Sequence, residues 1–144
     1  MAIDKILVKQ RLALISEYLT ELEALSHLPK EEFVKKRTAA SAESFLRRSL
    51  EAIFDVGRHI LAKSGGTNLA QEYKSIAQGL KQKGIISIDL EGQLIKMAGY
   101  RNRMVHLYFQ ISDEELYEII SHYLEDIQRF QKEILAYLSK QKQM

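Results

Sequence analysis

The 144-residue chain contains no cysteine, a single proline and only seven glycines. Without cysteine, disulfide bonds and thiolate metal sites are excluded, and a reducing cytoplasm is the natural location. Scarce proline and glycine leave few turn residues, which disfavours many short strands and allows long helices. No apolar run approaches the roughly 20 residues of a membrane-spanning helix. The N-terminus lacks the basic-then-apolar order of a signal peptide. We therefore expect a cytoplasmic protein without a membrane segment.

The chain also has little net charge. Its formal value is +2 at pH 7, which is too small to indicate a nucleic-acid binder by itself. Basic clusters at 35–37 and 47–48 could steer RNA, although a solvated helix face explains such clusters about as often. Hydrophobic residues make up 46% of the chain and charged residues 28%, which are values of globular domains. We expect one domain over residues 1–144.

Apolar residues recur at helical spacing along most of the chain. The first expected helix ends before Pro29, and the second runs through 42–60 and is closed by Gly65 and Gly66. A third covers about 68–83 and stops at Gly84, and a fourth begins at Ser87 or Ile88. The fifth is opened by a capping box formed by Ser112 and Glu115. A helical turn over 30–34 can follow the first, and the tail 140–144 should fray. Short connections favour antiparallel neighbours. The predicted fold is an all-α, up-and-down bundle of four main helices plus one shorter helix.

Residues 100–109 place the cation of Arg101, the imidazole of His106 and the phenol of Tyr108 within eight positions. Arg101 and Tyr108 fall on the expected apolar stripe of their helix, where a permanent charge is costly. That stripe contains Leu94, Met97, Ala98, Arg101, Val105 and Tyr108. At about 100° per residue, His106 points roughly 140° away from Arg101. A bend near His106, or a second copy of the chain in a symmetric dimer, would bring the groups together.

An imidazole beside a guanidinium suits metal-free cleavage of RNA. His106 would take the proton of a ribose 2′-OH or protonate the leaving 5′-oxygen. Arg101 stays charged at any relevant pH and can bind two phosphate oxygens, so it would stabilise charge on the pentavalent phosphorus. Asn102 and Arg103 could add donors to the phosphate. Because the 2′-OH is the nucleophile, DNA would be spared.

The Arg-x4-His spacing alone is weak evidence, so other interpretations stay open. Arg101 could pair with a buried acid such as Asp55, while His106 faces solvent and Tyr108 fills the core. The chain would then be a helical dimerisation protein. Alternatively, Arg101 and His106 could hold a phosphate in a noncatalytic, nucleotide- or substrate-binding subunit of a nucleotidyltransferase. That subunit would form a tight complex without turning over RNA.

The arrangement Arg101-Asn102-x-x-x-His106-x-Tyr108, preceded by residues 97–100, resembles the Arg-x4-His-x-Tyr signature of the HEPN superfamily, and most closely its HepT toxin branch. The likeness extends to residues 55–60, 84–86 and 111–113. It implies a helical homodimer in which two motifs face one cleft. It also implies a metal-independent endoribonuclease whose unchecked activity arrests growth, with Arg101 and His106 as the catalytic pair.

HepT toxins are similarly encoded beside a small nucleotidyltransferase antitoxin, MntA, which attaches AMP from ATP to the tyrosine of the motif. Here that residue is Tyr108. Adenylate would add bulk and negative charge to the cleft and so exclude RNA phosphate. The resemblance implies three partners, which are a second copy of the chain, an MntA-like antitoxin and RNA. It implies no cofactor for this chain, because ATP and Mg²⁺ serve the antitoxin. Asp55 is a possible orienting acid near Arg101.

Overall fold

The computed structural model describes residues 3–63, 72–105 and 111–141, and these residues form helices without any strand. The helices are α1 (Lys5–Ser26), α2 (Lys30–Phe33), α3 (Lys36–Lys63), α4 (Tyr73–Gln82), α5 (Ile88–Val105), α6 (Asp113–His122) and α7 (Leu124–Lys140). The all-α prediction is confirmed for these ranges. Within them, four long helices are joined by three shorter ones rather than by the one that the sequence predicted. None of these helices is long and apolar enough to cross a membrane.

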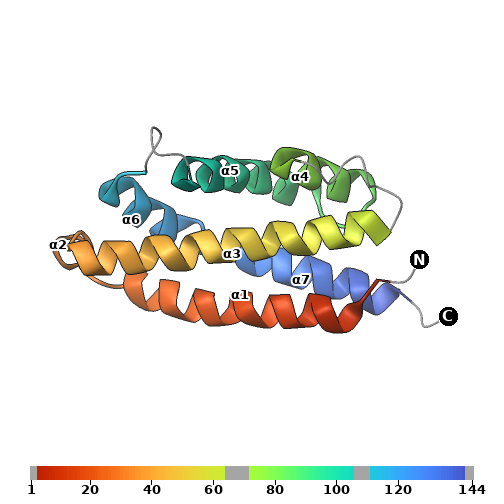
Figure 1. Ribbon diagram of the computed structural model, residues 1–144, viewed down its shortest axis with the longest axis horizontal. Coiled ribbons are helices and arrows are strands. Elements are labelled where there is room, and N and C mark those ends of the chain that lie inside the picture. Colours follow the sequence, from red (N-terminus) through yellow and green to blue (C-terminus); the bar gives the residue numbers. More distant parts are fainter. Residues whose placement is uncertain (1–2, 64–71, 106–110, 142–144) are drawn as a thin grey trace.

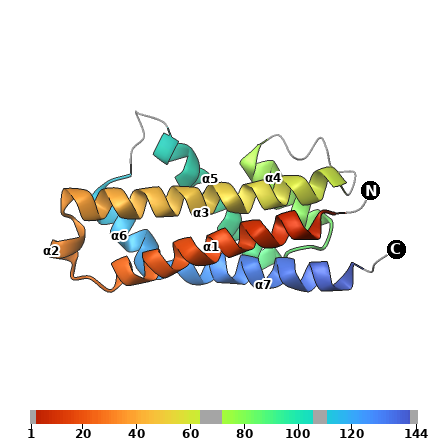
Figure 2. The ribbon, with the colours of Figure 1, turned by 60° about the horizontal axis from the view of Figure 1, so that its bottom comes forward.

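The longest helix, α3, runs through the middle of the bundle (Figure 1). It packs against α1 along one side and against α4 and α5 along another. Helix α7 lies along α1, as the turned view shows (Figure 2). The first and last long helices meet at one end, where Lys5 Nζ donates a hydrogen bond to the carbonyl oxygen of Gln141 at 2.6 Å. Helix α3 therefore lies between α1 on one side and α4 and α5 on the other.

The predicted apolar stripes form the core. The buried residues of α1 are Val8, Leu12, Ile15, Leu19 and Leu22. Those of α3 include Ala42, Ser49, Ile53, Val56 and Ile60. Each large apolar side chain removed from water contributes about 1.5–3 kcal/mol. The stop at Gly84 is confirmed as well, because this glycine follows the C-cap residue of α4 and adopts a φ of +73°.

The predicted fifth helix is two helices, α6 and α7, which meet at Tyr123. Tyr123 has a φ of −119°, outside the helical range, although its amide still donates to the carbonyl oxygen of Ile119 at 2.9 Å. The apolar repeat continues through the break, from Leu116 and Ile120 in α6 to Ile127 in α7. The periodicity therefore contained no signal for a break, and neither glycine nor proline marks it.

Helix α4 packs closely on α3 because Gly57 has no side chain. A Cβ atom at Gly57 would lie 2.5 Å from Cγ2 of Ile76 and 3.1 Å from Cδ1 of Leu80. The aromatic rings of Tyr73 and Phe54 also meet between these helices, with their centroids 4.9 Å apart. This close packing fixes Tyr73, the first residue of α4, against α3.

Candidate active site

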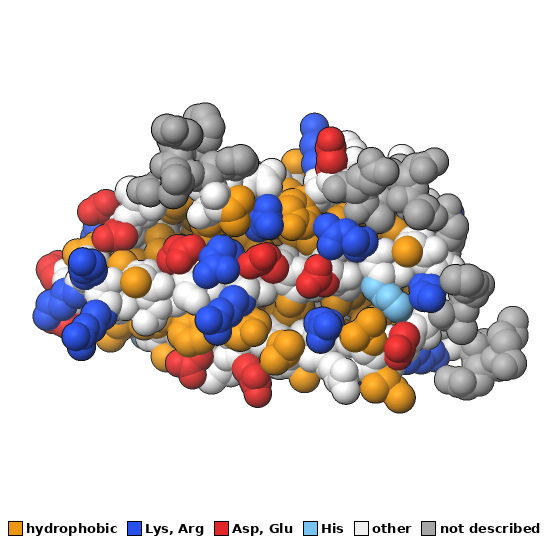
Figure 3. All heavy atoms as spheres, viewed as in Figure 1, with side chains coloured by type: hydrophobic (Ala, Val, Ile, Leu, Met, Phe, Trp, Pro, Cys, Tyr) orange, Lys and Arg blue, Asp and Glu red, His pale blue; other side chains and the backbone are white. Residues whose placement is uncertain are grey.

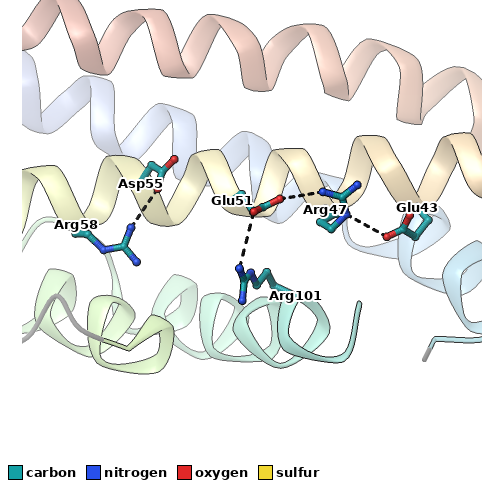
Figure 4. A network of polar contacts seen from close by, with 6 residues as sticks. All are labelled: Glu43, Arg47, Glu51, Asp55, Arg58 and Arg101. Carbon is teal, nitrogen blue, oxygen red and sulfur yellow. Dashed lines mark hydrogen bonds and ion pairs between the residues drawn. The ribbon is translucent and has the colours of Figure 1, made fainter. Parts of the chain in front are cut away.

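Arg101 projects from α5 towards α3, and its side chain is 20% exposed (Figure 4). Its Nη2 lies 3.8 Å from Oε2 of Glu51, and its guanidinium carbon lies 4.4 Å from the centroid of the Tyr73 ring. Its Nε is buried and has no hydrogen-bond partner among the described residues. A separation of 3.8 Å is an ion pair but too long for a hydrogen bond. The guanidinium is thus held in place while much of its donor capacity is unused.

Glu51 belongs to a row of alternating charges along α3. Arg47 reaches Glu43 through Nε and Glu51 through Nη1, each at 3.2 Å. Acidic and basic side chains alternate across the middle of the face in Figure 3. Because the Glu51 carboxylate also contacts Arg47, it neutralises Arg101 only in part. Arg47, from one of the two basic clusters, is itself balanced by two glutamates.

The acid that the structure places against Arg101 is Glu51, one helical turn before Asp55. Asp55 instead pairs with Arg58 of the same helix, with Nη1 and Oδ1 3.1 Å apart. Glu51 and Asp55 are four residues apart and so share one face of α3, which made them equivalent in the sequence. The Asp55 pairing expected for Arg101 is thus replaced by a pairing with the half-buried Glu51. A role of Asp55 in orienting the site stays a prediction.

The apolar stripe of α5 is buried only through Ala98. Leu94, Met97 and Ala98 are buried, but Val105, which the pattern placed on the same stripe, is 42% exposed. The end of α5 therefore emerges from the core one turn after Arg101. Asn102 lies on the exposed side of this turn.

His106 and Tyr108 lie in 106–110, outside the described residues. His106 directly follows Val105, the last residue of α5. Their predicted roles in catalysis and modification stay predictions. The structure defines the two helix ends that this segment joins, α5 before it and α6 after it.

Those two ends are connected by a bidentate ion pair. Nη1 and Nη2 of Arg103 each donate to one carboxylate oxygen of Glu115, both at 2.7 Å. These hydrogen bonds raise the pKa of the Arg103 guanidinium and lower the pKa of the Glu115 carboxyl. Arg103 was predicted to contact phosphate, and in this state any phosphate would compete with Glu115. That role stays a prediction.

The same pair changes the predicted cap of α6. Ser112 Oγ accepts a hydrogen bond from the amide of Glu115 at 3.1 Å, as a capping box requires. The Glu115 carboxylate, however, binds Arg103 in place of the expected return bond to Ser112. A bidentate, charge-assisted pair is stronger than a bond to a neutral amide.

We expect Glu115→Gln to destabilise the fold in a pH-dependent way. Because the folded-state pKa of Glu115 is below its ordinary value of 4.5, its stabilisation is present above that value. It is lost as the pH falls through the folded pKa. Arg103 and Glu115 are 39% and 37% exposed, so the loss at pH 7 should be at most about 1 kcal/mol.

Urea unfolding at pH 7 and near pH 3 measures this difference. Glu114→Gln, which removes an exposed charge from the same first turn of α6, should cause a smaller loss at pH 7 and controls for the helix dipole. An equal loss from Glu115→Gln at both pH values would contradict the assignment.

A hollow of about 500 Å³ opens between the start of α3, the end of α5 and the start of α6. The residues that line it include Lys36, Ala39, Met104, Ile111 and Leu116. Met104 and Ile111 stand close to the two ends of 106–110. This size is typical of small-molecule and cofactor sites. Across the described ranges, no group of three or more histidines or acids could hold a metal ion.

Comparison with protein families and curated proteins gives consistent results. The family model described as ribonuclease HepT-like matches residues 15–134. The tRNA nuclease HepT of Aphanizomenon flos-aquae is 25% identical over 137 residues, which cover 94% of this chain and 92% of that protein. The mRNA nuclease HepT of Shewanella oneidensis is 31% identical over 85 residues, covering 59% of this chain and 63% of that protein.

Solved structures with the same fold include a toxin bound to its antitoxin. The tri-AMPylated HEPN toxin of Shewanella oneidensis, in complex with the MNT antitoxin, has a TM-score of 0.79 and 25% identity, over 90% of this chain and 96% of the toxin. YutE of Bacillus subtilis, a cytosolic protein of unknown function, has a TM-score of 0.79 and 20% identity over 95% of this chain and 92% of YutE. At 20% identity, the likeness to YutE shows the fold alone.

Proposed function

The chain belongs to the ribonuclease HepT-like family, and we propose that it is the toxin of a toxin–antitoxin pair that cleaves RNA without a metal ion. The observation that carries this proposal is the state of Arg101. Its guanidinium is held between α3, α4 and α5, its Nε has no partner among the described residues, and its ion pair is long. A half-buried cation in this state suits an anionic ligand.

In the proposed reaction, Arg101 binds non-bridging oxygens of the scissile phosphate. The 2′-oxygen attacks phosphorus while its proton passes to a base, and the bond from phosphorus to the 5′-oxygen breaks. His106 moves a proton at one of these two oxygens. The products are a 2′,3′-cyclic phosphate and a 5′-hydroxyl. Asn102 and Arg103 are proposed as further phosphate contacts, and Asp55 as a possible orienting acid.

We propose that the active form is a homodimer. A helix that continued straight from α5 would direct His106 away from Arg101. Two copies related by a twofold axis would present two arginines and two histidines to one cleft. The hollow bordered by Met104 and Ile111 supports this location, since it adjoins both ends of the segment that contains His106.

The proposed partner is an MntA-like nucleotidyltransferase that attaches AMP to Tyr108. Support comes from the Shewanella oneidensis HEPN toxin, which is tri-AMPylated in its complex with an MNT antitoxin. The partner would use ATP and Mg²⁺, and this chain would use neither. Since its RNA substrate and the ATP of its partner are cytoplasmic, we assign the activity to the cytoplasm.

RNA turnover by the purified chain tests this proposal against the alternative of a noncatalytic subunit. The toxin should cleave RNA without its partner, because Arg101 and His106 both belong to this chain. A nucleotide- or substrate-binding subunit would bind its nucleotidyltransferase and leave RNA intact. Absence of turnover by the folded chain would therefore favour the subunit.

A further inference from the structure

The ring of Tyr73 lies where three helices meet. Tyr73 is the first residue of α4, and its ring centroid lies 4.9 Å from that of Phe54 in α3. The guanidinium carbons of Arg101 in α5 and Arg58 in α3 lie 4.4 Å and 5.6 Å from the same centroid. One aromatic ring thus supports the arginine of the candidate site from a separate helix.

The ring is well anchored. Phe54, which it packs against, is fully buried, so that contact cannot shift without disturbing the core. The close approach of α4 to α3 at Gly57 restrains the helix that starts with Tyr73. Tyr73 is therefore a rigid surface for the flexible side chain of Arg101.

An aromatic ring attracts a guanidinium through its π face, whereas a carboxylate binds the N–H groups directly. A guanidinium carbon 4.4 Å from the Tyr73 centroid is therefore held without a carboxylate taking up its donors. Glu51 approaches only to 3.8 Å, and the buried Nε has no described partner. The Tyr73 contact is thus the close contact that orients Arg101 without consuming its donors.

We propose that Tyr73 is a positioning residue for RNA cleavage, whose ring holds the Arg101 guanidinium in the orientation that binds the scissile phosphate. This inference rests on the proposed function. The ring acts and the hydroxyl does not, so Tyr73→Phe should retain activity. Tyr73→Leu, which removes the aromatic face, should lower kcat by about 10- to 100-fold, as misplacement of a catalytic group does. KM should change much less, because the oriented guanidinium acts mainly on the charge that develops in the transition state.

A double-mutant cycle distinguishes a role of Tyr73 in positioning Arg101 from a general role in the stability of the fold. If Tyr73 acts through Arg101, then Tyr73→Leu should lower kcat in the wild type and cause no further loss in Arg101→Ala. Tyr123→Leu is the matched control, because the Tyr123 ring lies 5.9 Å from the ammonium of Lys96 and is likewise half-buried. It should leave kcat within about threefold of wild type, since that cation is not in the candidate site.

The cleavage assay is run on variants whose folding is confirmed by circular dichroism and urea unfolding. Tyr73→Met, which fills the space with a flexible chain, replaces Tyr73→Leu if the leucine variant does not fold. A wild-type kcat for the folded variant, or an equal further loss in Arg101→Ala, would overturn the inference and leave the proposed function standing. No cleavage by the wild type would overturn both.

Discussion

Arg101→Ala should lower kcat/KM for RNA cleavage by about 10²- to 10³-fold, the cost of removing one preorganised donor group from a developing oxyanion. The guanidinium lies over Tyr73 with a buried, unpartnered Nε and a long ion pair to Glu51. Few protein hydrogen bonds are lost with it, so the fold should tolerate the change. The loss should therefore appear in catalysis, with the unfolding free energy within about 1 kcal/mol of wild type.

A matched variant controls for the loss of positive charge. Lys132→Ala removes the same unit charge from an exposed position of α7, outside the two basic clusters, and should change kcat/KM by less than about threefold at physiological salt. Arg101→Lys should fall between wild type and alanine, because lysine keeps the charge and lacks the planar fork. If folded Arg101→Ala retained more than a tenth of wild-type activity, Arg101 would not be the phosphate clamp.

Incubation with the cognate nucleotidyltransferase, ATP and Mg²⁺ should increase the mass of the wild type by about 329 Da per AMP group, a charge-adding modification. Tyr108→Phe should gain none, because it lacks the accepting hydroxyl. Intact-mass spectrometry measures this all-or-none difference. The modified wild type should stop cleaving RNA, while Tyr108→Phe should continue to cleave in the presence of the partner.

Tyr100→Phe is the control for this modification. Tyr100 directly precedes the motif and is half-buried in α5, and burial raises the pKa of its phenol. Its hydroxyl is less accessible to a partner enzyme, and its removal should leave the mass increase unchanged. AMP addition to Tyr108→Phe, or its loss in Tyr100→Phe, would contradict the assignment of the acceptor.

Local periodicity was sufficient to predict most of the helices. Repeats such as Val8, Leu12 and Ile15 record which face of a helix is buried, so the core of α1 and α3 followed from spacing. The break at Tyr123 could not be predicted in this way, because the apolar repeat continues through it. The predicted count of one shorter helix is not confirmed, since the described residues contain three, whereas the all-α class is confirmed for them.

A site residue could be predicted where its charge conflicted with an apolar helix face. It could not be predicted where its place in the site depends on contacts between helices. Arg101 was identified because a charge interrupts an apolar stripe. Glu51 could not be distinguished from Asp55 by spacing alone. Tyr73 was missed, because a ring on α4 has no periodic relation to an arginine on α5. The capping pattern predicted a return bond from Glu115 to Ser112, whereas the carboxylate binds Arg103 at the end of α5.

The most direct test of the central claim is the chemistry of the RNA ends that the purified chain produces in excess EDTA. A labelled RNA and a DNA strand of the same sequence are incubated with wild type and with His106→Ala. We predict that the wild type cleaves the RNA undiminished and leaves 2′,3′-cyclic phosphate and 5′-hydroxyl ends. We predict that it does not cleave the DNA and that His106→Ala cleaves neither strand. Inhibition by EDTA, 3′-hydroxyl ends, or cleavage of the DNA would contradict metal-free attack by the 2′-hydroxyl.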